Sequence, residues 1–287
     1  MRKVLALIVA ALVLSFSGCS SKEASASENA VKEPAADAKI STYLVGTYAD
    51  VDTTKAKLAE AGFEVVTAYK VDKKGEYTSI VFTNDALKAA ADKSNRGFAA
   101  VLRVLVNNEK QELSFTNPVY FGKAFLQDDF DFAAAEKLQE TLTATFGELK
   151  NSADAWEYEG LSGYHFMMGM PYYEENAVLA EGADTELLEK AKSYKKGKNL
   201  VFELKIGESR TLLGYALGRK TSKFVKKIGY QNAQVLPYTI LIEEGKAKIL
   251  APKYYIAVSY PQLTMGEFMT IASVPGAIEK DLAKPFK

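Results

Sequence analysis

The chain has 287 residues, with 36 basic and 36 acidic side chains, one histidine and one cysteine. This balance provides no global positive field that would attract nucleic acid, and the single cysteine excludes a disulfide within one chain. His165 is the only histidine and no Gly-x-Ser-x-Gly motif occurs, which argues against Ser-His-Asp catalysis and tetrahedral zinc binding. We therefore predict no catalytic residue.

Residues 1–18 have the pattern of a signal peptide. Arg2 and Lys3 precede the apolar run Val4–Phe16, which is shorter than the ~20 residues that a membrane-spanning helix needs. The following Phe16-Ser17-Gly18-Cys19 resembles a bacterial lipobox, although phenylalanine stands where leucine is usual. The resemblance implies cleavage before Cys19 and attachment of diacylglycerol to its thiol, with the lipid membrane as partner.

Residues 19–39 contain no aromatic side chain and are rich in serine, alanine and glutamate. Such a segment buries too little apolar surface to offset its ordering entropy, so we predict a lipid-anchored flexible tether. Ser20 rather than aspartate follows Cys19, which under the enterobacterial sorting rule implies the outer membrane. The predicted location is the bacterial cell envelope, lipid-anchored and facing the periplasm.

A β-hairpin pattern occurs twice, in Arg103–Phe125 and in Leu236–Tyr260. We predict two tandem duplicated α+β domains, 40–150 and 151–287, each a mainly antiparallel sheet with helices on one face. Their cores should contain Val104, Val106 and Leu113 in the first copy and Ile240, Ile242 and Ile249 in the second. The aligned pairs are Val106 with Ile242, Lys110 with Lys246, Leu113 with Ile249, Pro118 with Pro252, and Tyr120 with Tyr254.

Each hairpin should turn at a residue that tolerates positive φ, at Asn107-Asn108 in the first copy and Glu244-Gly245 in the second. Since proline cannot donate to a strand ladder, Pro118 and Pro252 should end the return strands. We expect an aromatic strand after each proline, over Val119–Phe125 and Tyr254–Tyr260.

The remaining elements follow from hydrophobic periodicity and capping residues. Asp128, Asp129 and Asp131 could bind a hard cation, but their place before the helix Phe132–Phe146 favours capping. The other expected strands are Ile40–Tyr48, Phe63–Val71, Tyr77–Thr83, Tyr164–Met170 and Asn199–Ile206. The other expected helices are Thr53–Ala61, Ala86–Lys93, Asp184–Ser193, Ser209–Leu217, Ser222–Ile228 and a stretch from Thr264 interrupted at Pro275-Gly276.

This order of elements, the hairpin and the stretch Met269–Glu279 together resemble the DUF302 (TT1751-like) α+β family. The resemblance covers residues 40–147 and 198–285 as two copies. It implies the fold, and because that family has no established functional motif it implies no site residue.

The segment Tyr164–Tyr173 holds His165 and three of the six methionines. Imidazole and thioether ligands suit Cu(I) or haem, with candidate ligands His165, Met167, Met168, Met170, Met265 and Met269. The alternative is a buried strand whose methionines fill gaps in the core. Glu174-Glu175 is the nearest acidic pair, and it could equally be a solvated turn.

The balanced total charge conceals an internal asymmetry. Residues 128–189 hold 15 acidic and 2 basic side chains, whereas residues 190–227 hold 12 basic and 2 acidic ones. In the basic part, a short helix could present a cationic face to an anionic lipid or an acidic protein partner, and the alternative is a solvated face that balances the acidic segment. The residues concerned are Arg219, Lys220, Lys223, Lys226 and Lys227.

Two functions remain open. The first is a membrane-anchored envelope lipoprotein that serves as a noncatalytic binding or assembly module. The second is a metal-handling protein, for Cu(I) or haem, or an enzyme that uses the His165 region. We predict no cofactor for the first function.

Overall fold

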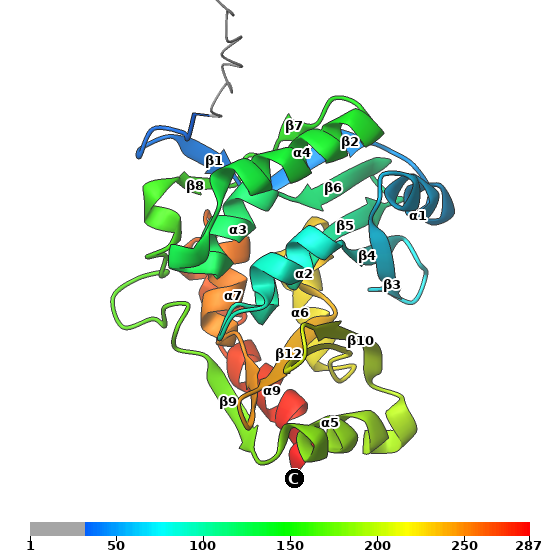
Figure 1. Ribbon diagram of the computed structural model, residues 1–287, viewed down its shortest axis with the longest axis vertical. Coiled ribbons are helices and arrows are strands. Elements are labelled where there is room, and N and C mark those ends of the chain that lie inside the picture. The colour runs from blue at the N-terminus through cyan, green and yellow to red at the C-terminus, as the bar shows by residue number, and fades with distance from the viewer. Residues whose placement is uncertain (1–31) are drawn as a thin grey trace, which may run out of the picture. The chain divides into compact units, whose positions relative to one another are not determined.

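Antiparallel sheets organise the computed structural model, which describes residues 32–287. A six-stranded sheet lies in the N-terminal half, defined as residues 39–157, and a five-stranded sheet lies in the C-terminal half, defined as residues 158–287. A small sheet pairs β1 (Lys39–Ser41) with β8 (Ala155–Glu157). The predicted α+β class with antiparallel sheets is confirmed (Figure 1).

The sheet of the N-terminal half has the strand order β3-β4-β5-β6-β2-β7. Its strands are β2 (Tyr43–Thr47), β3 (Glu64–Lys70), β4 (Tyr77–Thr83), β5 (Leu102–Asn107), β6 (Glu112–Thr116) and β7 (Lys150–Asn151). Its helices are α1 (Val51–Glu60), α2 (Asp85–Ala91), α3 (Pro118–Leu126) and α4 (Phe132–Phe146), with the 3₁₀ helix η1 (Gly97–Ala100).

The sheet of the C-terminal half has the order β10-β11-β12-β13-β9. Its strands are β9 (Ala177–Glu181), β10 (Leu200–Ile206), β11 (Arg210–Tyr215), β12 (Tyr238–Glu243) and β13 (Lys246–Ile249). Its helices are α5 (Asp184–Ser193), α6 (Phe224–Ile228), α7 (Pro252–Ser259), α8 (Met265–Thr270) and α9 (Val274–Ala283), with the 3₁₀ helix η6 (Tyr230–Val235). Taken in chain order, strands β2 to β6 of the first sheet and β9 to β13 of the second occupy corresponding places.

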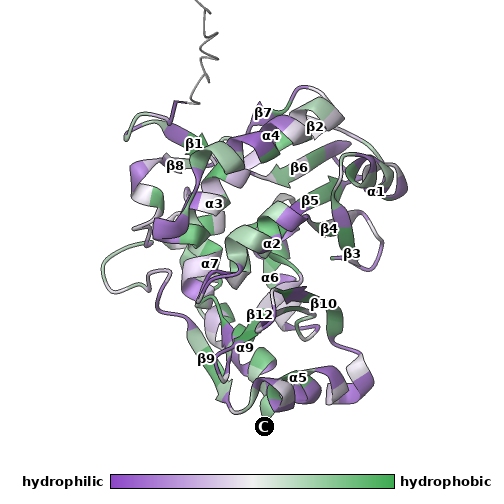
Figure 2. Ribbon diagram, viewed as in Figure 1, coloured by the Kyte–Doolittle hydropathy of each residue, from purple (hydrophilic) through white to green (hydrophobic). Residues whose placement is uncertain are grey.

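Helices pack on each sheet through apolar side chains. Leu58 of α1 and Leu142 of α4 join Ile80 and Val104 of the six-stranded sheet in one buried cluster. A second cluster spans both halves and includes side chains of α3, α5, α7 and α9. In Figure 2 the strands are largely hydrophobic, while α5 and much of α4 are hydrophilic on the surface, as expected for helices with one buried face.

In each half, one 3₁₀ helix packs on the sheet of the other half. η1 contacts β11 and β12, whereas η6 contacts β4 and β5. Gly97 in η1 lies so close to Leu241 that a Cβ atom there would collide with the leucine side chain. A side chain at this position would displace Leu241, because the backbone of η1 packs directly on the five-stranded sheet.

The two segments that follow the hairpins are helices, so the strand prediction for Val119–Phe125 and Tyr254–Tyr260 is wrong. Pro118 and Pro252 each occupy the first turn of a helix, where the missing N–H is not needed. Asn117 caps α3 by accepting a hydrogen bond from Val119 N at 2.9 Å. Both prolines therefore start helices instead of only ending strands.

Two further predictions in the C-terminal half are wrong. The segment predicted as the helix Ser209–Leu217 contains β11, which pairs with β10 on one side and β12 on the other. The segment Tyr164–Met170 is a loop with turns and not a strand. The strand β9, which pairs with β13, was not expected.

Several local predictions are confirmed. The helices Phe132–Phe146 and Asp184–Ser193 have the predicted bounds. Glu244 and Gly245 both have positive φ, as predicted, at 53° and 74°.

Two other local predictions need correction. In the first hairpin the positive φ lies at Gln111 (54°) and not at Asn107-Asn108. Helix α9 continues through Pro275, so the terminal interruption lies before it.

The last residues of the predicted tether are hydrogen-bonded to the C-terminal half. Tyr158 N and Glu159 N donate to the carbonyl oxygens of Ala38 and Ala36, so the segment from residue 36 is held along β8. Cys19 lies outside the described residues. No helix among residues 32–287 is long and apolar enough to cross a membrane.

Candidate functional site

The predicted metal site around His165 falls on a loop beside α8. The ring of Phe166 stacks on that of Phe268 at 5.2 Å, which brings the loop next to the helix that carries Met265 and Met269. The imidazole of His165 packs against Tyr172 with ring centroids 4.4 Å apart.

Four of the five candidate methionines are exposed, and the fifth, Met170, is half-buried. Met168 is 95% exposed and Met269 is 62% exposed, and Met167 and Met265 are also at the surface. The interpretation of a buried strand with gap-filling methionines is therefore wrong. The residues described include no group of three His, Cys, Asp or Glu side chains placed to hold a metal, and a thioether site for Cu(I) or haem stays a prediction.

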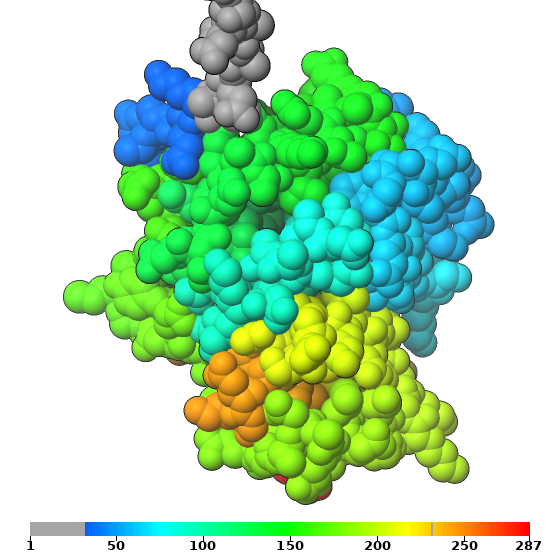
Figure 3. Space-filling view, viewed as in Figure 1, coloured from blue at the N-terminus to red at the C-terminus, as the bar shows by residue number. Residues whose placement is uncertain are grey.

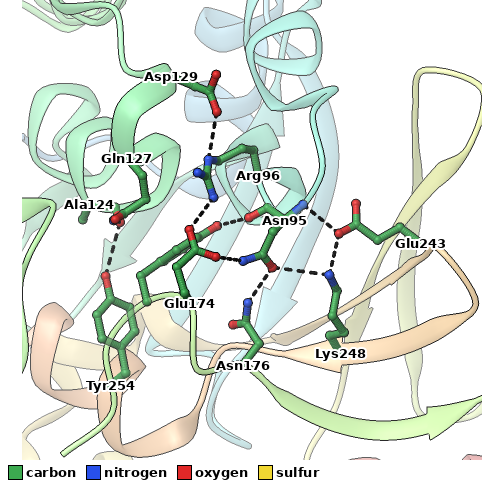
Figure 4. A network of polar contacts seen from close by, with 11 residues as sticks. Asn95, Arg96, Ala124, Gln127, Asp129, Glu174, Asn176, Glu243, Lys248 and Tyr254 are labelled. Atoms are coloured by element: carbon green, nitrogen blue, oxygen red, sulfur yellow. Dashed lines mark hydrogen bonds and ion pairs between the residues drawn. The ribbon is translucent and has the colours of Figure 1, made fainter.

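Glu174, the acid nearest His165 in sequence, belongs to a polar network between the two halves (Figure 4). Its carboxylate accepts hydrogen bonds from Arg96 Nη1 at 2.8 Å and from the side-chain amide of Asn95. Arg96 Nε also donates to Asp129 at 3.1 Å. A hydrogen bond from Lys93, together with Arg96, lowers the pKa of the Asp129 carboxyl.

The same network reaches the end of β12. Glu243 is fully buried and accepts from Lys248 Nζ at 2.6 Å, from Arg210 Nε at 2.8 Å and from Asn95 N at 2.8 Å. Arg210 Nη1 also binds Asp92 at 2.6 Å. The buried charges of this network are thus paired, as buried charges usually are, and the contacts connect the two halves.

Two of the three acids before α4 are engaged, and the third, Asp128, is exposed at the surface. Asp131 caps the helix by accepting from Ala134 N at 3.1 Å, as predicted, and Asp129 binds Lys93 and Arg96. Both acids edge an apolar hollow between α2, α3 and α4, visible between the cyan and green segments in Figure 3. Apart from these two acids, no polar side chain among residues 32–287 lines this hollow.

A larger groove brings together two basic segments that are far apart in the sequence. It has a volume of about 630 Å³, within the range of small-molecule sites, and lies between the turn joining β3 to β4 and the region of α6. We call it the basic groove. It is lined by Val71, Asp72, Lys73, Lys74, Glu76, Tyr77, Arg219, Ser222, Lys223, Val225, Lys226 and Tyr230.

Five cations line the groove and two acids accompany them. Asp72 is engaged with the backbone of its own turn, where it accepts from Lys74 N at 2.9 Å and Tyr77 N at 3.1 Å. Glu76 forms an exposed ion pair with Lys74 at 3.6 Å, which contributes about 0–1 kcal/mol. The groove therefore keeps a local excess of positive charge.

Three of the five predicted cationic residues, Arg219, Lys223 and Lys226, line this groove. Lys227 instead donates to the carbonyl oxygen of Thr270 at 2.9 Å, and Lys220 is exposed outside the lining. The sequence did not identify Lys73 and Lys74 on the opposite wall. The pattern Lys73-Lys74-Gly75 indicates a turn, and nothing in the sequence places that turn beside α6.

Two tyrosines form part of the groove wall. Tyr77 and Tyr230 stack at 4.6 Å with an interplanar angle of 12°, and Tyr77 is only 5% exposed. The Tyr77 hydroxyl donates to Glu109. The stacked pair connects β4 of the N-terminal half to η6 of the C-terminal half. It therefore links the two walls of the groove.

The corresponding junction of the C-terminal half is closed. There the turn between β10 and β11 meets the end of α2, and a Cβ atom at Gly207 would collide with Asp92. Arg210, at the start of β11, binds both Asp92 and Glu243. Opposite charges close this junction, whereas like charges face one another across the basic groove.

No family model, curated protein or solved structure matches this chain.

Proposed function

We propose that this chain is a lipid-anchored envelope lipoprotein that acts as a noncatalytic binding module, with the basic groove as its ligand site. The observation that carries the proposal is the meeting of Lys73 and Lys74 with Arg219, Lys223 and Lys226 across one groove. The ligand is anionic.

The charge in the groove favours this reading over a solvated face. Among the described residues, Lys74 is the only one of the five cations that forms an ion pair. Like charges held on two facing walls repel each other, and a concave site concentrates their field. An anion between the walls relieves that repulsion, which gives binding a driving force that salt should weaken.

The arrangement of the cations indicates the class of ligand. Two walls from different segments each carry at least two cations, so a ligand with two or more phosphate groups can contact both walls at once. Lysine ammonium groups bind phosphate as point charges without a demand for planar geometry. We therefore propose an oligophosphate-bearing ligand.

The two-walled arrangement favours a soluble oligophosphate over a lipid headgroup. A headgroup with a single phosphate, such as that of phosphatidylglycerol, places one anionic group in the groove and cannot contact both walls at once.

We also infer that the two halves arose by duplication. The shared order of five strands supports this proposal, as do the aligned hairpins. The reciprocal packing of η1 and η6, each on the sheet of the other half, also supports it. The resemblance to the DUF302 family stays a prediction. If the halves are duplicates, the closed junction at Arg210 and the open groove occupy equivalent places in the two halves.

The soluble Cys19→Ala protein tests the proposal in three titrations. We expect it to bind tripolyphosphate in isothermal titration calorimetry, with affinity that falls as salt rises. Phosphatidylglycerol vesicles should bind no better than phosphatidylcholine vesicles. Absence of tripolyphosphate binding would reject the proposed ligand class, and salt-sensitive binding to phosphatidylglycerol vesicles alone would assign the groove to lipid.

A further inference from the structure

A second, smaller site lies inside the molecule, between the two halves. It is a cavity of about 20 Å³, which is room for about one water-sized particle. All of its lining residues except Val101 are buried. The polar lining residues are Tyr43, Arg103, Thr116, Gln234, Thr239, Tyr255 and Ser259.

Arg103 on β5 supplies a buried positive charge to this cavity. The residue is 4% exposed, and its Nη1 donates to the carbonyl oxygen of Gln234 at 2.7 Å. Arg96 and Arg210 both bind carboxylates, whereas Arg103 forms no ion pair with any described residue. An unpaired buried cation is costly, because its lost hydration is not replaced.

The rest of the lining offers mainly hydrogen-bond donors. Ser259 Oγ is buried without a partner, and the hydroxyls of Thr239 and Tyr255 make no hydrogen bond within the described residues. Gln234 Oε1 is a buried acceptor without a partner, and its Nε2 donates to Ser114. The lining therefore holds three hydroxyls and a guanidinium that can donate, together with one unpaired amide oxygen, and no carboxylate lines the cavity.

We propose that Arg103 binds a chloride-sized monovalent anion in this cavity. The anion neutralises the guanidinium and accepts hydrogen bonds from hydroxyls such as those of Ser259 and Tyr255. Because the lining joins β5, η6 and α7, the bound anion stabilises the contact between the two halves. This site is separate from the basic groove and shares no lining residue with it.

The neighbouring tyrosines cannot supply the negative charge themselves. Burial raises the pKa of Tyr255, although the Arg103 guanidinium opposes the shift. Burial also raises the pKa of Tyr43 well above 10.0. Both phenols are neutral at physiological pH and can act as donors to an anion but not as counter-ions.

Bromide identifies the occupant directly. Crystals of the soluble Cys19→Ala protein grown in sodium bromide should show an anomalous peak within contact distance of the Arg103 guanidinium. Ordered density at that place without anomalous signal would identify a water molecule and overturn the proposal, as would a cavity without density.

Unfolding in chloride tests the site in solution. In the same soluble protein, the ratio of folded to unfolded protein should rise about tenfold for each tenfold rise in chloride above the dissociation constant, with sodium gluconate keeping ionic strength constant. Arg103→Met should abolish this dependence, and Arg210→Met, at a paired arginine, should keep it. Equal chloride dependence in Arg103→Met would overturn the proposal.

A milder variant covers the case in which Arg103→Met fails to fold. Ser259→Ala with Tyr255→Phe removes two donors and keeps the charge. The anion should then bind more weakly, so the rise in stability should begin at a higher chloride concentration. A chloride response identical to that of the parent protein would contradict the proposed coordination.

Discussion

Tyr120 and Tyr254 donate hydrogen bonds in opposite directions between the same two helices. The Tyr120 hydroxyl in α3 donates to the carbonyl oxygen of Val258 in α7 at 2.8 Å, and the Tyr254 hydroxyl in α7 donates to Ala124 in α3 at 3.3 Å. Both tyrosines are buried. The hairpin alignment pairs these two residues, and their hydrogen bonds connect the two halves.

Removing either hydroxyl should destabilise the protein by a similar amount. A net contribution of about 0.5–1.5 kcal/mol is typical of one hydrogen bond, so Tyr120→Phe and Tyr254→Phe should each lower the free energy of unfolding by that amount. Tyr172→Phe, at a 47% exposed position, serves as the control. Urea denaturation measures all three, and unchanged midpoints for both buried variants would contradict the reciprocal contact.

Stability should fall as the solution becomes alkaline. Burial raises the pKa values of Tyr120, Tyr238 and Tyr254 well above 10.0. Above about pH 10 the unfolded chain releases these protons while the folded chain retains them, so the unfolded state is favoured. Urea midpoints should be constant below this pH and decrease above it. Phenolate absorbance should show buried tyrosines ionising only on unfolding.

The aligned core positions should respond to truncation. Ile242 is 2% exposed and Val106 is fully buried. Ile242→Ala should lower the free energy of unfolding by about 2–5 kcal/mol, and Val106→Ala should lower it by less because fewer atoms are removed. The exposed change Lys246→Ala should stay within about 0.5 kcal/mol. An effect of Ile242→Ala no larger than that of Lys246→Ala would show that the register is wrong.

The lipid anchor is tested by one substitution. A chain with two acyl groups is held firmly at a membrane, so Cys19→Ala should move the protein from the membrane pellet to the soluble envelope fraction. Immunoblots of fractionated cells measure the shift. Retention of the variant in the pellet after a high-salt wash would show that another feature holds the protein at the membrane.

Hairpin strands and strongly amphipathic helices could be predicted from the sequence because their periodicity is local. The helix Phe132–Phe146 has a capping aspartate, an apolar stripe and a final glycine, all within reach of a local pattern. The buried run in β11 has no such marker. It is apolar on both faces, and only its position between β10 and β12 makes it a strand.

Helices α3 and α7 were missed because aromatic residues favour strands. Tyr120, Ala124 and Tyr254, Val258 are nevertheless spaced four apart, which is the helical repeat. Proline at the first turn was the local signal that could have found them.

Half of the groove could be predicted from the sequence and half could not. The wall from Arg219 to Lys226 follows from a cluster of charge near a short helix. The wall at Lys73 and Lys74 depends on β4 and β5 lying against η6, a long-range contact with no local signal. Charge counts identify the cations, and only the fold shows which of them face each other.

The central claim is that the basic groove binds an oligophosphate-bearing ligand. Two charge-reversal triples of the soluble Cys19→Ala protein compare the groove with a matched surface. Arg219→Glu, Lys223→Glu and Lys226→Glu alter the groove, and Lys195→Glu, Lys196→Glu and Lys198→Glu make the same change in net charge outside its lining.

Calorimetric titration of both triples with tripolyphosphate is the decisive measurement. The groove triple should bind about tenfold more weakly or worse, a loss of at least ~1.4 kcal/mol, while the matched triple should stay close to the parent protein. Equal weakening in both triples would mean that the net charge and not the groove attracts the anion, and unchanged binding in the groove triple would contradict the assignment of the site.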